Sequence, residues 1–214
     1  MARTPRTPRT QEQRKAETRQ RLLTAAAFMF ARDGYDAVTV DQIGEAAERT
    51  SGSVYAHFGN KQGVLLALLE GFQDDLAAVI QAEFVTREDL AGRLLGLWRN
   101  VADHPDPDGG SWFFLEIELW LQAARDTDLS GPLRDRYRVI HALMREEFRS
   151  WVREFALEPP IEVDALPQAV MAALMGLQMQ RTADESAVSE AVALSVLLAL
   201  FGAGLDIVNR LPKE

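Results

Sequence analysis

The 214-residue sequence contains no cysteine. This absence excludes disulfide frameworks, thiolate zinc sites, iron–sulfur ligation and cysteine nucleophiles, and it fits a reducing cytoplasm. The sequence also lacks an uninterrupted apolar run of about 18 residues, so no membrane helix is expected. The longest candidate, residues 191–205, is bounded by Glu190 and Asp206. Because the N-terminus is polar and arginine-rich, without the apolar stretch of a signal peptide, the chain is predicted to be soluble and cytoplasmic.

Histidine is scarce, and the motifs of common enzyme classes are missing. The three histidines, His57, His104 and His141, do not stand at metal-ligand spacing. No glycine-rich dinucleotide motif, P-loop or nucleophile elbow occurs. Residues 104–109 resemble the start of a calcium loop, but its twelfth position is Leu115, where a bidentate glutamate is needed. The sequence therefore predicts no enzyme activity, no metal and no cofactor.

Charge is distributed unevenly along the chain. The net charge is −9, yet residues 1–61 carry ten Lys or Arg against seven Asp or Glu, whereas the remainder carries 13 against 25. Such asymmetry is typical of a protein in which one part meets a polyanion. A chance fluctuation with a solvated basic tail is the alternative, and charge alone leaves both open.

Helical patterns cover almost the whole chain after a short arm. Residues 1–10 repeat Arg-Thr-Pro, which blocks a helix and offers nothing apolar to bury. Apolar stripes and punctuation then predict helices at about 11–33, 40–47, 51–58, 61–84, 86–103, 112–125, 130–155, 165–181 and 187–209. Their expected N-terminal caps are Thr39, Asn60, Thr86, Ser130, Asp164 and Ser186. The prediction is an all-α fold of about nine helices.

Residues 39–58 read as a helix-turn-helix, two short helices joined by a tight turn. In this motif the second helix presents small or hydrogen-bonding side chains to base edges in the major groove and apolar ones to the core. The outward candidates are Thr50, Ser51, Gly52, Ser53, Tyr55, Ala56 and His57, while Val54 and Phe58 face inward. Lys61 adds a cation beside the unpaired amides of the next helix, which predicts a phosphate contact.

Residues 18–70 resemble the DNA-binding domain of the TetR/AcrR family of transcriptional regulators. The family pattern can be followed on Ala25, Gly34, Tyr35, Thr39, Val40, Ile43, Ala46, the run from Tyr55 to Phe58, and Lys61. The turn departs from it, with Glu48 and Arg49 where the family often has glycine and an apolar residue. The second helix departs at Ser51 and Ala56, where larger or basic residues are frequent. These departures put the base preference in doubt and leave the fold unaffected.

The resemblance implies roles for these residues. Thr39, Tyr55 and Lys61 match positions that hold DNA phosphates, and Thr50, Ser51, Ser53, Ala56 and His57 match positions near base edges. For His57 a half-buried imidazole capping the helix end is the alternative, and for Tyr55 it is simple packing. Arg3, Arg6 and Arg9 of the arm either enter the minor groove or only solubilise the chain.

The resemblance also implies a C-terminal domain that binds a small effector and forms a homodimer. The predicted organisation is an arm at 1–10, a DNA-binding domain at 11–60 and an effector and dimerisation domain at 61–214. A Gly176-Leu177 pair is similar to the choline-repressor (BetI-like) type. Aromatic and polar side chains that suit a pocket wall are Trp98, Trp112, Phe113, Glu116, Trp120, Tyr137, His141, Met175 and Gln178. An ordinary hydrophobic core is the alternative for each of them.

The last two predicted helices, at 165–181 and 187–209, favour a dimer interface, because the second is apolar on nearly every side. An interior helix of a monomer is the alternative. Together these observations predict a homodimeric repressor that binds a pseudo-palindromic operator in double-stranded DNA and is released by an unidentified small-molecule effector. The competing hypotheses are an architectural DNA-binding protein and a small-molecule carrier with a degenerate DNA-binding domain.

Overall fold

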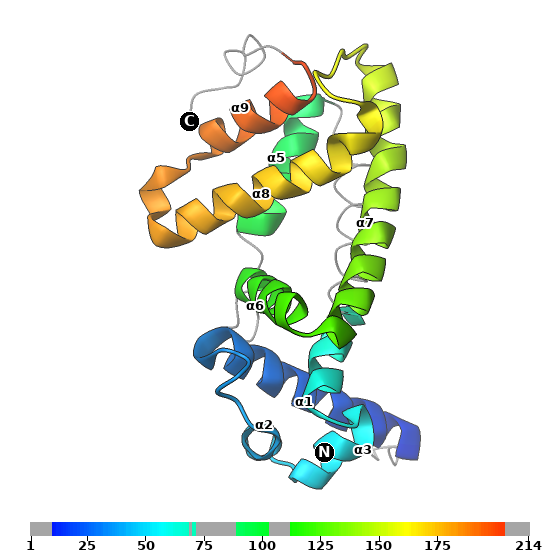
Figure 1. Cartoon of the computed structure of the whole chain (residues 1–214), viewed down its shortest axis with the longest axis vertical. Helices are drawn as coiled ribbons and strands as arrows, with labels where there is room; N and C mark the ends of the chain where they lie inside the picture. The colour runs from blue at the N-terminus through cyan, green and yellow to red at the C-terminus, as the bar shows by residue number, and fades with distance from the viewer. Residues whose placement is uncertain (1–9, 69, 72–88, 103–111, 204–214) are drawn as a thin grey trace, which may run out of the picture. The chain divides into compact units, whose positions relative to one another are not determined.

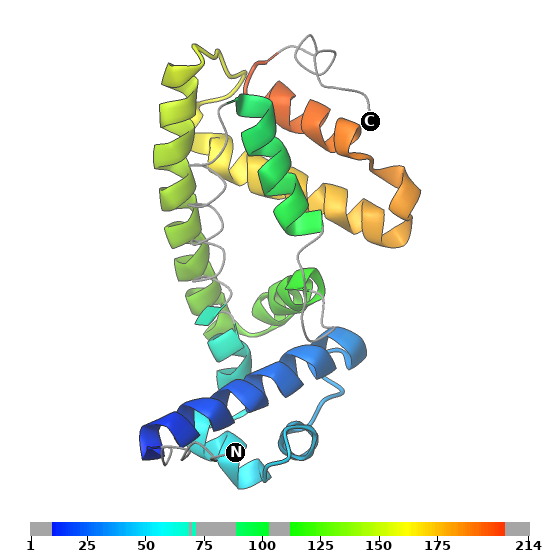
Figure 2. The same cartoon turned by 180° about the vertical axis from the view of Figure 1, so that it is seen from behind.

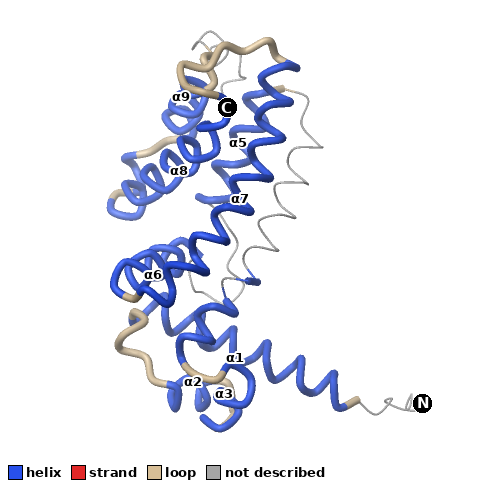
Figure 3. The backbone as a smooth tube through the Cα atoms, turned by 45° about the vertical axis from the view of Figure 1, so that its right-hand side comes forward, coloured by secondary structure: helices blue, strands red, loops and turns tan. Residues whose placement is uncertain are grey.

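The computed structural model describes residues 10–68, 70–71, 89–102 and 112–203. Within these ranges every regular element is a helix and none is a strand (Figure 3). Counting the helix that begins at residue 61, they contain nine α-helices and two short 3₁₀ helices. This confirms the predicted all-α fold. In the described part of the chain, no helix combines the length and hydropathy that crossing a bilayer requires.

The chain divides into two compact units. The first comprises residues 1–71 and 106–125, with α1 (Gln11–Asp33), α2 (Val40–Ala46), α3 (Ser51–Phe58), the start of the helix at 61, and α6 (Trp112–Arg125). The second comprises residues 72–105 and 126–214, with α5 (Leu90–Ala102), α7 (Thr127–Glu154), α8 (Leu166–Ala183) and α9 (Glu190–Leu200). The compact first unit thus extends past residue 60 and includes α6, because α6 packs on α1. The functional division at residues 60 and 61 stays a prediction.

Helix α1 contributes one row of buried side chains to the core of the first unit. Its buried side chains lie on one stripe, at Leu22, Leu23, Ala26, Met29 and Phe30. The helix ends where Gly34 takes a φ of 82°, which glycine adopts without steric cost, and the Gly34 amide donates to the Phe30 carbonyl oxygen at 3.0 Å. This confirms the end predicted from the sequence. The first turns of α1, residues 11–17, are exposed.

Helices α2 and α3 lie against α1 in Figure 1 and share its core. Each contributes one fully buried anchor, Ile43 from α2 and Val54 from α3. The turn between them bends sharply at Glu48, whose φ is 55°, a left-handed conformation that is unfavourable for a residue with a Cβ. The Arg49 amide then donates to the Gly44 carbonyl oxygen at 2.7 Å and closes the turn.

Helix α6 contacts α1 and also reaches the turn that follows α1. Phe113, Leu115 and Leu119 of α6 are buried. At its end, the Gln122 amide nitrogen donates to a carboxylate oxygen of Asp36 at 3.3 Å. The Asp36 carboxylate also lies 3.6 Å from the Arg125 guanidinium, in an exposed ion pair.

The second unit is organised around the long helix α7. Its buried stripe consists of Leu129, Leu133, Arg136, Ile140, Met144, Phe148 and Trp151. Phe148 and Trp151 cluster with Phe201, which follows α9, with ring centroids 5.1 to 5.9 Å apart. Figure 2 shows α5 crossing α8 within this unit, beside α9. The helices therefore enclose an aromatic and aliphatic core.

At the surface of the second unit, arginine–carboxylate pairs connect neighbouring helices. The two-pronged pairs are Arg93 of α5 with Glu154 of α7, Arg99 of α5 with Glu190 of α9, and Arg149 of α7 with Asp164. Hydrogen bonds from the Arg99 guanidinium lower the pKa of Glu190, against the opposing effect of burial. The same interaction from Arg149 lowers the pKa of Asp164.

The starts of α5 and α7 differ from the predicted ones. Helix α5 begins at residue 90, because the Asp89 carboxylate caps it by accepting from the Gly92 amide at 2.6 Å. Thr86, the predicted cap, lies outside the described residues. Helix α7 begins at residue 127, capped by Asp126, and Pro132 lies inside it. The prediction of a start at Ser130 was wrong, because the Asp126 carboxylate supplies the cap by accepting from the Asp128 amide at 2.9 Å.

The last two helices also have different ends. Asp164 does not cap α8, because its carboxylate is bound by Arg149 and a 3₁₀ turn precedes the helix. Ser189 rather than Ser186 caps α9, accepting from the Val192 amide at 3.3 Å. The predicted helices at 165–181 and 187–209 are thus 166–183 and 190–200, and residues 204–209 of the second prediction lie outside the described residues. Gly202, with a φ of 70°, passes too close to the Glu158 carbonyl for any side chain.

The turn between α2 and α3 generates a prediction about stability. Replacing Glu48 with glycine relieves the left-handed strain, and we expect the free energy of unfolding to rise by about 1 kcal/mol. Glu48→Ala is the matched control, because it removes the same exposed ion pair with Arg21 and keeps the strain. Urea unfolding of both variants measures the difference. Equal midpoints for the glycine and alanine variants would contradict the expectation.

Candidate nucleic-acid interface

Helix α3 presents a small and polar surface to solvent. Only Val54 is buried, whereas Gly52 and Ala56 are exposed and the Tyr55 ring is 55% exposed. The helix spans eight residues and ends at Gly59, whose φ is 78°. A helix of this length, anchored by one buried side chain and bare on its outer face, has the form that enters a major groove.

The hydroxyls before and within α3 are not used to cap the helix. Thr50 occupies the N-cap position without a side-chain hydrogen bond to the backbone. Its hydroxyl instead lies 3.4 Å from the Ser53 hydroxyl, a contact in which either oxygen can donate. Ser51 is half-buried. Hydroxyls that can rotate between donor and acceptor roles suit contacts with base edges.

The Thr39 hydroxyl, by contrast, is engaged in the capping box predicted from the sequence. It accepts from the Gln42 amide at 3.3 Å and lies 2.9 Å from the Gln42 side-chain oxygen. That oxygen also accepts from the Thr39 amide at 2.8 Å. Thr39 therefore fixes the start of α2, and a phosphate contact by its exposed side chain stays a prediction.

Gly44 determines how closely α3 approaches α2, and sequence reasoning did not single it out. A Cβ at this position would stand 2.9 Å from the Ser51 amide nitrogen and 2.9 Å from the Thr50 carbonyl carbon. A glycine inside an otherwise good helix is the signal that could have identified this close backbone approach.

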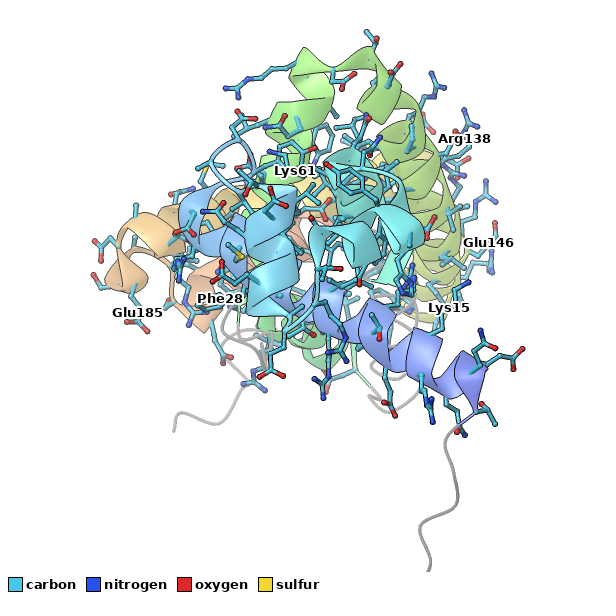
Figure 4. All side chains as sticks on the ribbon, turned by 90° about the horizontal axis from the view of Figure 1, so that it is seen from below. Lys15, Phe28, Lys61, Arg138, Glu146 and Glu185 are labelled. Carbon is cyan, nitrogen blue, oxygen red and sulfur yellow. The ribbon has the colours of Figure 1, made fainter. Side chains whose placement is uncertain are left out.

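Two cations of α1 that the sequence did not identify lie beside α3. The Arg19 guanidinium stands 5.4 Å from the centre of the Phe58 ring, and Lys15 and Arg19 both act electrostatically on His57. Figure 4 shows Lys15 on α1 at this side of the unit. In the described ranges no ion pair involves Lys15 or Arg19, whereas Arg21 pairs with Glu48 at 3.4 Å.

His57 is half-buried at the end of α3, and its pKa is lowered. Burial is the largest cause, followed by the positive charges of Lys15 and Arg19. Burial and the two cations therefore both disfavour the charged imidazolium. The predicted contact between His57 and a base stays a prediction, as does the alternative of a packed imidazole.

Lys61 lies at the start of the helix that follows α3, but its ammonium group points back into the unit. It donates to the carbonyl oxygens of Tyr35 and Val38, each at 2.9 Å, and stands 4.3 Å from the centre of the Tyr35 ring. Figure 4 shows Lys61 among these segments. The structure thus gives this side chain intramolecular partners, while the phosphate contact predicted for it stays untested.

The residues predicted to bind an effector fall into both units. In the first unit Phe113 and Glu116 are buried and Trp120 is 46% exposed, while the side chain of Trp112 lies outside the described residues. No common cavity can therefore be assigned to the whole set. Every one of these roles stays a prediction.

The second unit contains the remaining members. Trp98 is buried and lies under the Arg181 guanidinium, with 5.9 Å to the ring centre. The rings of Tyr137 and His141, one turn apart on α7, are 5.7 Å apart. Met175 and Gln178 of α8 are half-buried, and the buried Gln178 side-chain oxygen has no hydrogen-bond partner among the residues that the structure describes.

A comparison with known protein families identifies the helix-turn-helix region. The family "Bacterial regulatory proteins, tetR family" matches residues 22–68, which cover α1 from Leu22 onward, α2, α3 and the start of the next helix. Residues 22–68 therefore match the DNA-binding domain of the TetR family. Among the residues described, no group of three or more His, Asp or Glu side chains is arranged to hold a metal ion.

Curated relatives of this chain are transcriptional repressors. The repressor AcnR of Corynebacterium efficiens is 28% identical over 128 residues, which cover 60% of this chain and 62% of that protein. The repressor KstR2 of Rhodococcus jostii is 45% identical over 62 residues, covering 29% of this chain and 30% of KstR2. The match to KstR2 thus has a higher identity than the match to AcnR but covers fewer residues.

Solved structures share the fold of this chain. The regulator FadR from Bacillus subtilis, solved in complex with stearoyl-CoA, superposes with a TM-score of 0.69. It is 15% identical, and the match covers 86% of this chain and 99% of FadR. At this identity the likeness concerns the fold alone.

The electrostatic contact between α1 and α3 can be tested directly. We expect Lys15→Gln to raise the pKa of His57, because one of the two cations that disfavour the imidazolium is removed. The NMR titration of the imidazole protons measures it. His141 is the internal control, since burial and Arg145 lower its pKa instead. A His57 pKa that does not move would place Lys15 away from α3 in solution.

Proposed function

We propose that this TetR-family chain is a homodimeric transcriptional repressor of the bacterial cytoplasm, which binds a pseudo-palindromic operator and is released by a small-molecule effector. The observation that carries the proposal is α3, with Val54 buried and a polar, small-residue surface exposed. The repressors AcnR and KstR2 support the direction of regulation. No catalytic step is assigned, because these relatives are regulators.

Base recognition falls to the N-terminal half of α3 in this proposal. Thr50, Ser51 and Ser53 offer hydroxyls, while Gly52 and Ala56 leave room for the groove floor and for thymine methyl groups. Short side chains bring the backbone close to the bases. Specificity then depends on close fit and on a few hydrogen bonds rather than on long bidentate side chains.

Phosphate contacts come from Tyr55 and from the basic surface on α1. The Tyr55 hydroxyl is carried on a largely exposed ring, and Lys15 and Arg19 lie beside the end of α3. Neither cation is held in an ion pair within the described ranges, so both can approach a phosphate without first breaking one. The predicted contribution of the arginines of the arm concerns residues outside the described ranges.

The dimer is proposed to form through α8 and α9. Within the second unit these helices leave apolar side chains uncovered: Met179 is 53% exposed, Val192 45% and Val196 37%. Val192 and Val196 are four residues apart and so share one face of α9. Two copies meeting along α8 and α9 would cover these side chains, and a two-fold dimer would set its recognition helices about 34–36 Å apart, one turn of DNA.

The effector is proposed to bind in the second unit. The buried Gln178 side-chain oxygen has no partner within the described part of the chain, so it is an acceptor that a ligand hydroxyl or amide can satisfy. Tyr137 and His141 of α7 supply ring surfaces and polar atoms. FadR contains stearoyl-CoA, so a protein of this fold takes up a small molecule. Effector binding is proposed to shift the helix at 61 and thereby the spacing of the two recognition helices.

Operator binding is tested by selecting duplexes from a random-sequence library with the wild-type protein and titrating the selected duplex against excess random DNA. We expect saturable binding that survives the competitor. We also expect Lys15→Gln and Arg19→Gln each to reduce the magnitude of the log–log salt slope by about 1.8, because a homodimer loses a contact worth about 0.9 in each of its two subunits. Arg153→Gln, an exposed arginine on α7, is the matched control. A library that yields no preferred sequence would contradict the repressor.

The dimer interface yields a separate prediction. We expect Val192→Asp to convert the dimer into monomers, because it places a charge in an apolar contact. Val139→Asp on α7 is the matched control, since Val139 is 44% exposed against 45% for Val192. Analytical ultracentrifugation measures both. Dimers that persist in the Val192 variant, or dissociation in both variants, would argue against this interface.

A further inference from the structure

Lys61 stands at the junction between the recognition helix and the rest of the chain. Only Gly59 and Asn60 separate it from the end of α3. The Asn60 side chain caps the following helix by accepting from the Gly63 amide at 2.7 Å. A side chain at Gly63 would overlap the Phe58 carbonyl oxygen. The path from α3 to Lys61 is therefore short and fixed at both ends.

The ammonium group of Lys61 is surrounded by acceptors from one turn. It donates to the carbonyl oxygens of Tyr35 and Val38 at 2.9 Å each and lies 3.5 Å from that of Asp36. The Tyr35 ring covers it at 4.3 Å. An ammonium group has three protons and no acceptor, so these three carbonyls account for its whole donor capacity.

The turn that Lys61 binds, residues 34–38, connects α1 to α2. Tyr35 and Val38 are buried, and the Val38 amide donates to the Tyr35 carbonyl oxygen at 3.3 Å. The next residue, Thr39, is the N-cap of α2. Because the turn leads directly into the cap, its position determines where α2 begins.

We infer that Lys61 is a positioning residue, which ties the exit of α3 to the entry of α2 and so fixes the recognition helix on its scaffold. The inference rests on the proposed operator binding, and it assigns Lys61 a different role from a phosphate contact. A phosphate could bind the ammonium only after the carbonyls of Tyr35 and Val38 had released it. The contacts of Lys61 persist in the DNA complex.

Two variants separate the roles. Lys61→Met keeps the aliphatic stem and removes the donors. Lys61→Arg keeps the charge, but its planar guanidinium cannot direct three protons at three converging carbonyls. If Lys61 positions α3, both variants lose at least tenfold in affinity for the selected duplex, with salt slopes equal to that of the wild type. A phosphate contact would reduce the magnitude of the slope by about 1.8 in the Met variant, about 0.9 for each subunit of the dimer, and would preserve the affinity of the Arg variant. Either of those results would overturn the inference.

A measurement without DNA keeps the inference independent of the operator. In Lys61→Met we expect hydrogen exchange at the amides of Ile43 in α2 and of Ala47, the C-cap residue of α2, to speed at least tenfold relative to amides of α6. Leu119→Ala, a buried truncation in α6, is the control for general destabilisation. Equal acceleration across α2 and α6 would reduce Lys61 to an ordinary stabilising residue. If the wild type binds no selected duplex, the proposed function fails, while this exchange pattern still decides the positional role.

Discussion

Helices of seven and eight residues are too short to be stable alone, since isolated helices below about 12–15 residues are marginal in water. This constraint governs the helix-turn-helix at residues 39–58. Helices α2 and α3 exist because other groups hold them: one buried side chain each, a capping box on α2 and a close backbone approach at Gly44. Lys61 completes the set by joining the end of α3 to the turn before α2. The recognition surface is thus rigid because its backbone is held from both ends.

Charge is arranged differently in the two units. In the second unit Arg93, Arg99 and Arg149 are each engaged by a carboxylate in a two-pronged pair. Beside α3, Lys15 and Arg19 have no ion-pair partner in the described ranges. Paired arginines add geometric specificity between helices, whereas unpaired cations leave a positive surface beside α3. A chain with a net charge of −9 can therefore still present a local attraction to a polyanion.

The sequence predicted the parts of the fold that local chemistry determines. The capping box of Thr39, the stop at Gly34 and the limits of α3 follow from residue types at short spacing, and all are confirmed. The starts of α7 and α9 were misplaced because several capping residues stand close together. Tertiary contacts choose among such candidates, and they are not visible in a local pattern.

The candidate site was predictable in outline. The outward residues of α3 follow from helical periodicity around one apolar anchor. Lys15 and Arg19 were missed because they belong to α1, and only the packing of α1 brings them beside α3. The partners of Lys61 could not be foreseen either, since they are backbone carbonyls more than twenty residues away that have no side-chain signature.

The use of backbone carbonyls as the acceptors of Lys61 determines which substitutions the turn can tolerate. Every amino acid carries a carbonyl, so the turn at 34–38 can change its side chains and still hold the ammonium group, provided that its path is kept. Ala37, which is exposed, is the simplest case. Sensitivity to substitution is therefore concentrated at Lys61, which must keep its length and its charge. The turn that it binds must keep its backbone path more than its side chains.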